Sequence, residues 1–219
     1  MARFISIVSN APGTGKTTVA LNLGMALHKQ NQKVIVFDAD FSKPNMIEHL
    51  NISHLPVTIE DVFNGENHVF DSIYKHASGL KIIPSMSMND YSKLQYHLQD
   101  LMADYDYVIL DTPRDLYALE EVLKDSHEAI IVHSPEHSSK MVIDASRLLK
   151  KHKVLNLGIV LNKSNEDSVN KIFEFPIIAK VPMHKQITQS YKAKHPLLHI
   201  YPRGKPAKSF LLLAKKLVV

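Results

Sequence analysis

Short, nearly continuous apolar runs alternate along this chain with longer stretches in which apolar residues recur at helical spacing. Runs of this kind, rich in Val, Ile and Leu, are typical of strands that are buried on both faces of a sheet. They lie at residues 3–9, 33–38, 80–84, 107–111, 128–133, 155–161 and 177–181. The intervening periodicity predicts helices over about residues 15–30, 91–104, 115–124, 138–151 and 206–217.

Strands that alternate with helices in this way predict an α/β fold, with helices on both faces of a mostly parallel sheet. We therefore expect the three-layer, doubly wound arrangement. A chain of 219 residues is long enough to bury one full core of this type. No Gly/Ser-rich linker or internal repeat divides it, so the prediction is a single domain over residues 1–219.

The turn between the first strand and the first helix carries a phosphate-binding motif, Ser-Asn-Ala-Pro-Gly-Thr-Gly-Lys-Thr-Thr, at residues 9–18. Gly13 and Gly15 lack a Cβ, so the backbone can adopt left-handed angles and turn its N–H groups toward a phosphate. Lys16 supplies a charge to the terminal phosphates, and the hydroxyl of Thr17 is offered to Mg²⁺. The motif predicts a nucleotide site, and the alternative is an ordinary turn with a capping threonine.

One position of the general motif G-x-x-x-x-G-K-[ST] differs, because Asn10 stands where the first glycine is expected. Asparagine tolerates the left-handed region better than most residues. We therefore expect the loop to close despite this difference.

Further segments at strand ends point to one family. Asp38-x-Asp40-x4-Asn45 follows the second strand, and Asp111-Thr112-Pro113 follows the strand at 107–111. Residues 132–136, 158–163 and 179–182 end later strands. The order and spacing of these segments, together with the phosphate loop, resemble those of the MinD/ParA family of P-loop ATPases over nearly the whole chain. The spacing of Asp38-x-Asp40-x4-Asn45 is closer to the MinD branch of this family.

The resemblance implies roles for individual residues. Asp38 and Asp40 correspond to the acids of the first switch, one near the metal and one orienting the attacking water, and Asp111 to the acid that holds Mg²⁺ through water. Asn162 and Pro182 correspond to adenine contacts. Taken alone, an Asp at a strand end is most often a turn or capping residue. The implied catalytic set is Asp40, Lys16 and Asp38; the nucleotide set is Gly13, Thr14, Gly15, Lys16, Thr17, Thr18, Asn162 and Pro182; the metal set is Thr17, Asp38 and Asp111, with ATP or ADP and Mg²⁺ as cofactors.

The chain also departs from the family pattern. The family's loop begins with a lysine that reaches the partner's phosphates across an ATP-bound dimer, and here Ala11 and Pro12 replace that lysine and the following glycine. The loss implies slow or partner-dependent hydrolysis, since cations of this kind are worth roughly 10³–10⁵ in rate where they act. In the second switch, Arg114 stands where small residues are usual, and its simplest interpretation is a solvated loop charge.

Charge is distributed unevenly. The last 45 residues contain no Asp or Glu, so the net charge of +4 divides into about −5 before residue 175 and +9 after it. This asymmetry favours a polyanionic partner, either nucleic acid or an anionic membrane surface. The alternative is a solvated edge whose lysines keep the protein soluble.

The final apolar segment allows two interpretations, an amphipathic membrane helix or the last helix of the fold. Phe210, Leu213, Ala214 and Leu217 have the spacing of one buried face, so we favour docking against the sheet.

Composition narrows the function further. The absence of cysteine excludes disulfides, Cys-zinc sites and iron–sulfur clusters, and with them the cluster-carrying relatives of the family. The 13 histidines form no metal-binding pattern on a convincing helix, so we expect them to be scattered over the surface. Without a signal peptide or an apolar run of membrane-spanning length, we expect a cytoplasmic protein, with peripheral attachment to a membrane or the nucleoid as an option.

The sequence therefore predicts a MinD/ParA-like ATP-binding switch in spatial organisation, namely cell division, chromosome partitioning or organelle positioning. We expect slow or partner-stimulated ATPase activity, an ATP-dependent homodimer and an unidentified protein partner. One alternative is a nucleotide-binding regulator or scaffold without turnover. Another is a small-molecule kinase or synthetase on the same fold, although no segment indicates a substrate pocket or a lid.

Overall fold

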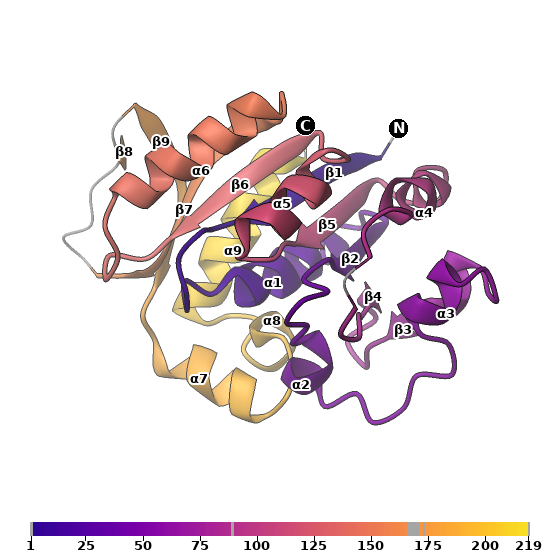
Figure 1. Cartoon of the computed structure of the whole chain (residues 1–219). Coiled ribbons are helices and arrows are strands. Elements are labelled where there is room, and N and C mark those ends of the chain that lie inside the picture. Colours follow the sequence, from indigo (N-terminus) through magenta and orange to yellow (C-terminus); the bar gives the residue numbers. More distant parts are fainter. Residues whose placement is uncertain (1, 89, 166–170, 173, 219) are drawn as a thin grey trace.

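The computed structural model describes residues 2–88, 90–165, 171–172 and 174–218, which form a nine-stranded sheet with helices on both faces (Figure 1). The strand order is β3-β4-β2-β5-β1-β6-β7-β9-β8. All neighbours from β4 to β9 are parallel, and β3 and β8 are antiparallel at the two edges. The predicted doubly wound α/β fold is thus confirmed. The strands are β1 (Arg3–Val8), β2 (Val34–Asp38), β3 (Tyr74–Lys75), β4 (Lys81–Ile83), β5 (Tyr107–Asp111), β6 (Glu128–His133), β7 (Leu155–Ser164), β8 (Lys171–Ile172) and β9 (Phe175–Pro182).

Alternate residues of the strands divide the core between the two faces of the sheet. Ile5 and Ile7 of β1 pack in the cluster that contains the buried sides of α1 and α9. Phe4 and Val8 point the other way, into clusters formed with α3, α4, α5 and α6. The helices are α1 (Lys16–His28), α2 (Met46–Leu50), α3 (Ile59–Phe63), α4 (Leu94–Leu101), α5 (Leu116–Leu123), α6 (Lys140–Lys151), α7 (Lys185–Lys192), α8 (Leu197–Ile200) and α9 (Lys205–Leu217), with a 3₁₀ turn at Val69–Ser72.

The register of the central strands determines where the functional loops meet. Asp111 at the end of β5 pairs with Ile7 of β1 on one side and with Asp38 of β2 on the other. The carboxyl ends of these three parallel strands therefore share one edge of the sheet, which is where open α/β sheets bind ligands. The phosphate loop and both acidic loops leave from this edge.

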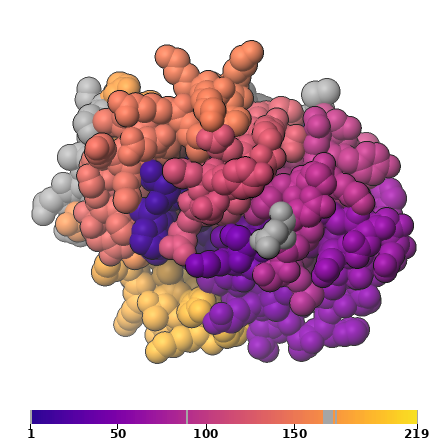
Figure 2. Space-filling model, viewed as in Figure 1, coloured from indigo at the N-terminus to yellow at the C-terminus, as the bar shows by residue number. Residues whose placement is uncertain are grey.

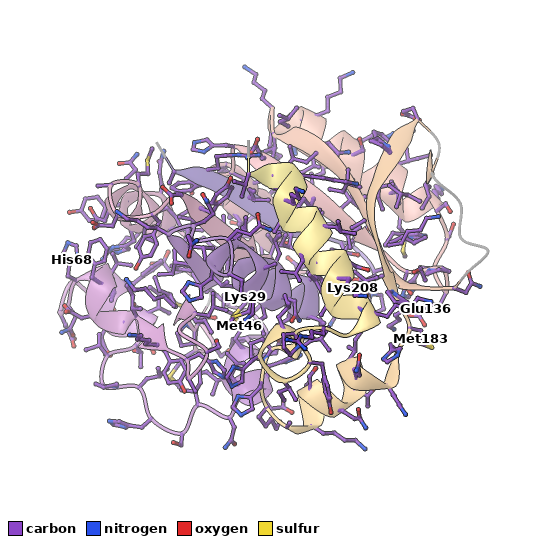
Figure 3. All side chains as sticks on the ribbon, turned by 180° about the vertical axis from the view of Figure 1, so that it is seen from behind. Lys29, Met46, His68, Glu136, Met183 and Lys208 are labelled. Carbon is purple, nitrogen blue, oxygen red and sulfur yellow. The ribbon has the colours of Figure 1, made fainter. Side chains whose placement is uncertain are left out.

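The C-terminal helix docks against the sheet, as its spacing predicts. Phe210, Leu213, Ala214 and Leu217 are buried in the same cluster as α1. Viewed from behind, α9 lies across the face of the sheet (Figure 3). Within the described ranges, no helix is both long enough and apolar enough to span a bilayer.

The histidines do not follow the expectation of a scattered surface distribution. His76, His97 and His133 are buried. The ring of His76, just after β3, lies 5.0 Å from that of His195 and 5.5 Å from that of His199, near α8. Sequence reasoning missed this cluster because its members come from segments more than 100 residues apart. Among the described residues, no group of three potential ligands could hold a metal ion.

Candidate functional site

The phosphate loop has the backbone geometry that its glycines predict. Gly13 and Gly15 adopt φ values of 66° and 88° in the left-handed region. Asn10 does not adopt a positive φ, so the loop closes without the left-handed residue that we expected there. A Cβ on Gly15 would also lie 2.3 Å from Nδ2 of Asn162. Both the backbone angle and the available space therefore require glycine at residue 15.

A pocket of about 360 Å³ opens over this loop. Three segments line it: residues 13–18 of the phosphate loop and the start of α1, residues between Asp40 and His49 after β2, and residues from Asp111 to Arg114 at the end of β5. In the space-filling view, the indigo part of the chain that includes the phosphate loop reaches the surface between later segments (Figure 2). The site is therefore assembled from loops at the carboxyl edge of β1, β2 and β5.

Lys16 is the buried cation of the pocket. Burial lowers the pKa of its ammonium group, and the nearby carboxylates of Asp111 and Asp40 partly oppose that shift. A bound anion would compensate the lost hydration of the charged form. The environment of Lys16 thus favours a phosphate ligand.

Thr17 and Asp111 come together as the predicted metal-binding pair. The hydroxyl of Thr17 donates to Oδ2 of Asp111 at 2.5 Å, and Oδ1 of Asp111 is buried without a hydrogen-bond partner in the described chain. Burial raises the pKa of Asp111 to about 6, against the lowering effect of Lys16. Oxygen donors of this type are those that Mg²⁺ prefers, so the unpaired oxygen fits a hydrated divalent cation.

Asp38 occupies a different place from Asp40. Its fully buried carboxylate accepts hydrogen bonds from the backbone N–H groups of Asp40 at 3.2 Å, Asn45 at 3.3 Å and Met46 at 3.2 Å. Burial and the neighbouring Asp111 raise the pKa of Asp38 well above its usual range. Asp38 does not line the pocket in the described structure; it holds the loop that presents Asp40. Its role as a metal ligand stays a prediction.

Asn162 connects β7 to the phosphate loop. Its Nδ2 donates to the carbonyl of Thr14 at 2.7 Å, and its Oδ1 is buried with no partner among residues that the structure describes. Pro182 lines a separate pocket of about 450 Å³ together with Ser164 and Met183. A free acceptor next to the loop fits an adenine amino group, and the adenine roles of Asn162 and Pro182 stay predictions.

Comparison with known proteins decides the family. The model of the AAA domain family matches residues 2–159. An ATP-binding protein of Methanocaldococcus jannaschii is 31% identical over 235 residues, covering 100% of this chain and 88% of that protein. The septum site-determining protein MinD of Synechocystis is 28% identical over 240 residues, covering 99% of this chain and 90% of that protein. The chain belongs to the MinD/ParA family of P-loop ATPases.

Solved structures of MinD superpose closely on this MinD/ParA-family chain. The septum site-determining protein MinD of Pyrococcus horikoshii, complexed with Mg-ADP, has a TM-score of 0.88 at 28% identity and covers 100% of this chain and 96% of its own. The cell division ATPase MinD of Pyrococcus furiosus has a TM-score of 0.89 at 30% identity, with coverage of 99% and 98%.

The structure also shows how this family member accommodates its altered loop. Ala11 is 1% exposed, and its N–H donates to the hydroxyl of Ser9 at 3.3 Å. The position that resemblance assigns to a reaching lysine is therefore turned inward. Lys16 remains the lysine that the phosphate loop itself contributes to the pocket.

Sequence reasoning missed Lys43 and His49, which also line the pocket of this MinD/ParA-family chain. Lys43 lies within the motif Asp38-x-Asp40-x4-Asn45 and His49 lies shortly after it, so their proximity to Asp40 along the chain was the available signal. It was a weak signal, because exposed loop charges usually face solvent. The ring of His49 also contacts that of Tyr191 on α7, with centroids 4.7 Å apart.

Proposed function

We propose that this chain binds Mg-ATP and acts as a nucleotide-dependent switch in spatial organisation, with slow or partner-stimulated ATPase activity. The observation that carries the proposal is the meeting of Lys16, the Thr17–Asp111 pair and Asp40 in one pocket. The matched MinD proteins are named for septum-site determination and cell division, so cell division is the first process to test.

Each residue of the pocket has a distinct task in this proposal. The N–H groups of residues 13–17 bind phosphate oxygens, and Lys16 contributes its charge. Thr17 and Asp111 would hold Mg²⁺, which supplies neutralisation of phosphate charge and orientation of the phosphate oxygens. Asp40 accepts a hydrogen bond from a water and orients it, while Asp38 keeps the loop of Asp40 in place.

The hydrogen bonds around Asp40 support its assignment as the water-orienting residue. Its Oδ1 accepts from the hydroxyl of Ser42 at 2.9 Å and from the N–H of Lys43 at 3.1 Å. These bonds fix the carboxylate at the pocket wall. A hydrogen-bond acceptor held in place in this way is what the orientation of a water requires.

Ala11 supports a second candidate, a nucleotide-binding regulator that does not turn over ATP. Steady-state phosphate release separates the two candidates, because both bind nucleotide and only the switch with ATPase activity produces phosphate. The molecular mass of the protein in solution is then measured with and without Mg-ATP, because the proposal includes an ATP-dependent homodimer.

The nucleotide assignment is tested by calorimetric titration of Lys16→Ala with Mg-ATP. Loss of a charge-assisted phosphate contact costs about 1.5–3 kcal/mol, so affinity should fall at least tenfold. Lys29→Ala is the matched control, because it removes the same charge from the exposed C-terminal end of the same helix. Unchanged binding in Lys16→Ala would refute the site.

The basic C-terminal segment supports a polyanionic partner, DNA or an anionic membrane surface. Lys192, Arg203 and Lys208 are exposed on different parts of this segment. Their joint replacement by Ala should flatten the salt dependence of binding to DNA, whose slope is about 0.9 per phosphate neutralised. Anionic vesicles form the parallel arm. The control is the double variant Lys140→Ala, Lys150→Ala on α6. Binding that does not depend on salt would favour the alternative, in which these lysines only keep the protein soluble.

A further inference from the structure

Two cations at the pocket wall have no pairing partner among the residues that the structure describes. Lys43, after β2, and Arg114, after β5, line the pocket together with the phosphate loop and are exposed. Neither side chain makes a hydrogen bond or ion pair within the described chain, whereas Lys124, Lys151 and Lys163 elsewhere on the surface each pair with a glutamate. No carboxylate of the described chain therefore pairs with the charge of Lys43 or Arg114, and both charges lie beside an anion-binding loop.

The backbone next to each of these side chains is anchored. The N–H of Lys43 donates to Oδ1 of Asp40 at 3.1 Å. Asp115, which follows Arg114, caps α5 by accepting from the N–H of Ala118 at 3.0 Å. The backbone at or next to both cations is therefore held in place, while their side chains are free to move. Each side chain can reach a ligand without unfolding of its loop.

The phosphate loop itself supplies little positive charge to a bound nucleotide, so cations from other loops can add to it. With Ala11 turned inward, Lys16 is the cation that the loop supplies. ATP carries one more phosphate group than ADP, and the negative charge at its end has to be met by donors beyond those that hold the inner phosphates. Arginine binds phosphate oxygens with a planar fork, and lysine acts as a mobile point charge.

We infer that Lys43 and Arg114 contact the terminal phosphate of ATP, so that a single copy of this chain distinguishes ATP from ADP with its own loops. The inference rests on the proposed nucleotide site, and it adds that this site recognises the terminal phosphate of ATP. It also separates ATP recognition from dimerisation, because both cations belong to the protomer that holds the nucleotide.

The test is calorimetric titration with Mg²⁺ and either ADP or a non-hydrolysable ATP analogue. It is carried out at a protein concentration at which sedimentation shows a monomer. Lys43→Ala and Arg114→Ala should each weaken analogue binding about tenfold, and the double variant should weaken it more, as expected for hydrogen bonds to charged groups. ADP affinity should stay within about twofold, which also shows that the variants are folded. Arg114→Lys should retain part of the analogue affinity.

Lys150→Ala and Arg203→Ala, which remove exposed cations outside the pocket, should leave both affinities unchanged. The inference is overturned if the Lys43 and Arg114 variants bind the analogue as well as the wild type does. It is equally overturned if the preference for the analogue arises only in a dimer, since the cation would then come from the partner. In either case intact ADP binding leaves the nucleotide site standing, whereas a wild type that binds neither ligand refutes both proposals.

Discussion

Acid should weaken the attachment of the C-terminal segment to the sheet edge, because a buried neutral histidine joins them. Nδ1 of His76 accepts the N–H of Ser78 at 3.0 Å, so the single ring proton lies on Nε2. That nitrogen then donates to Nδ1 of His195, 2.9 Å away. Protonation of His76 places a positive charge in this cluster of three imidazole rings.

The size of the effect follows from the pKa of His76. Burial first, and then the neighbouring His195 and His199, lower this pKa from 6.5 to about 4. Burial first, and then His195 and Lys29 just after α1, also lower the pKa of His199. Between pH 6.5 and 4 the unfolded chain therefore binds a proton that the folded chain does not, and stability falls as the pH falls. The difference of about 2.5 in pKa corresponds to about 3 kcal/mol, a large part of a typical domain's stability of about 5–15 kcal/mol.

Urea unfolding of the wild type and His76→Gln at several pH values between about 7.5 and 4 measures this contribution. Gln can still accept from Ser78 and donate to His195, but it does not titrate. The wild type should lose up to about 3 kcal/mol more than the variant over this range. His54→Gln, at an exposed site, should retain the wild-type slope. Equal losses in the wild type and His76→Gln would refute the reasoning.

Three further substitutions test the site and its supports. Gly15→Ala should abolish Mg-ATP binding in calorimetry, because the backbone there has a φ of 88° and the new Cβ would lie 2.3 Å from Asn162. Gly24→Ala should lower urea stability by about 1–3 kcal/mol, since its Cβ would lie 2.4 Å from Cγ2 of Val36. Burial raises the pKa of Asp125 to about 6, so its carboxylate costs stability as the pH rises from about 4 to 6. Asp125→Asn should therefore add about 1 kcal/mol at pH 7, after allowance for solvent screening, and nothing at pH 3.

The parallel strands were predictable because their information is local. Each is a continuous apolar run between turns, and residues of β1, β2 and β5 are almost fully buried. The docking of α9 was predictable for the same reason, since one face carries all its apolar anchors. The phosphate loop needed only its glycines and the elements on either side of it.

The short helices were harder to predict because their apolar partners are remote in sequence. Leu197 and Leu198 of α8 are fully buried, and the N–H of Leu198 is held by the side chain of Asn22 on α1. A four-residue helix has no periodicity from which to infer this. For α3 a local signal did exist, since Thr58 and Asp61 form a capping box.

The candidate site was also predictable only in part. The pairing of Thr17 with Asp111 follows from strand order and register, which the sequence predicts through the family resemblance. The division of labour between Asp38 and Asp40 does not follow from sequence, because the two residues are of the same type and only Ala39 separates them. Only the hydrogen bonds to Asn45 and Met46 reveal that Asp38 serves the backbone.

A switch requires that the pocket be physically connected to a surface that a partner can reach, and the loop after β2 makes this connection. The loop carries Lys43 at the pocket wall and continues directly into α2. Glu48 of α2 accepts hydrogen bonds from the hydroxyl of Tyr191 at 3.2 Å and, at its carbonyl, from the ammonium of Lys194 at 2.9 Å. Because α7 lies within the basic C-terminal segment, residues 175–219, a ligand that draws Lys43 into the pocket would act on an element that is hydrogen-bonded to that segment. The coupling that the proposed switch requires would therefore run through a few contacts between neighbouring elements.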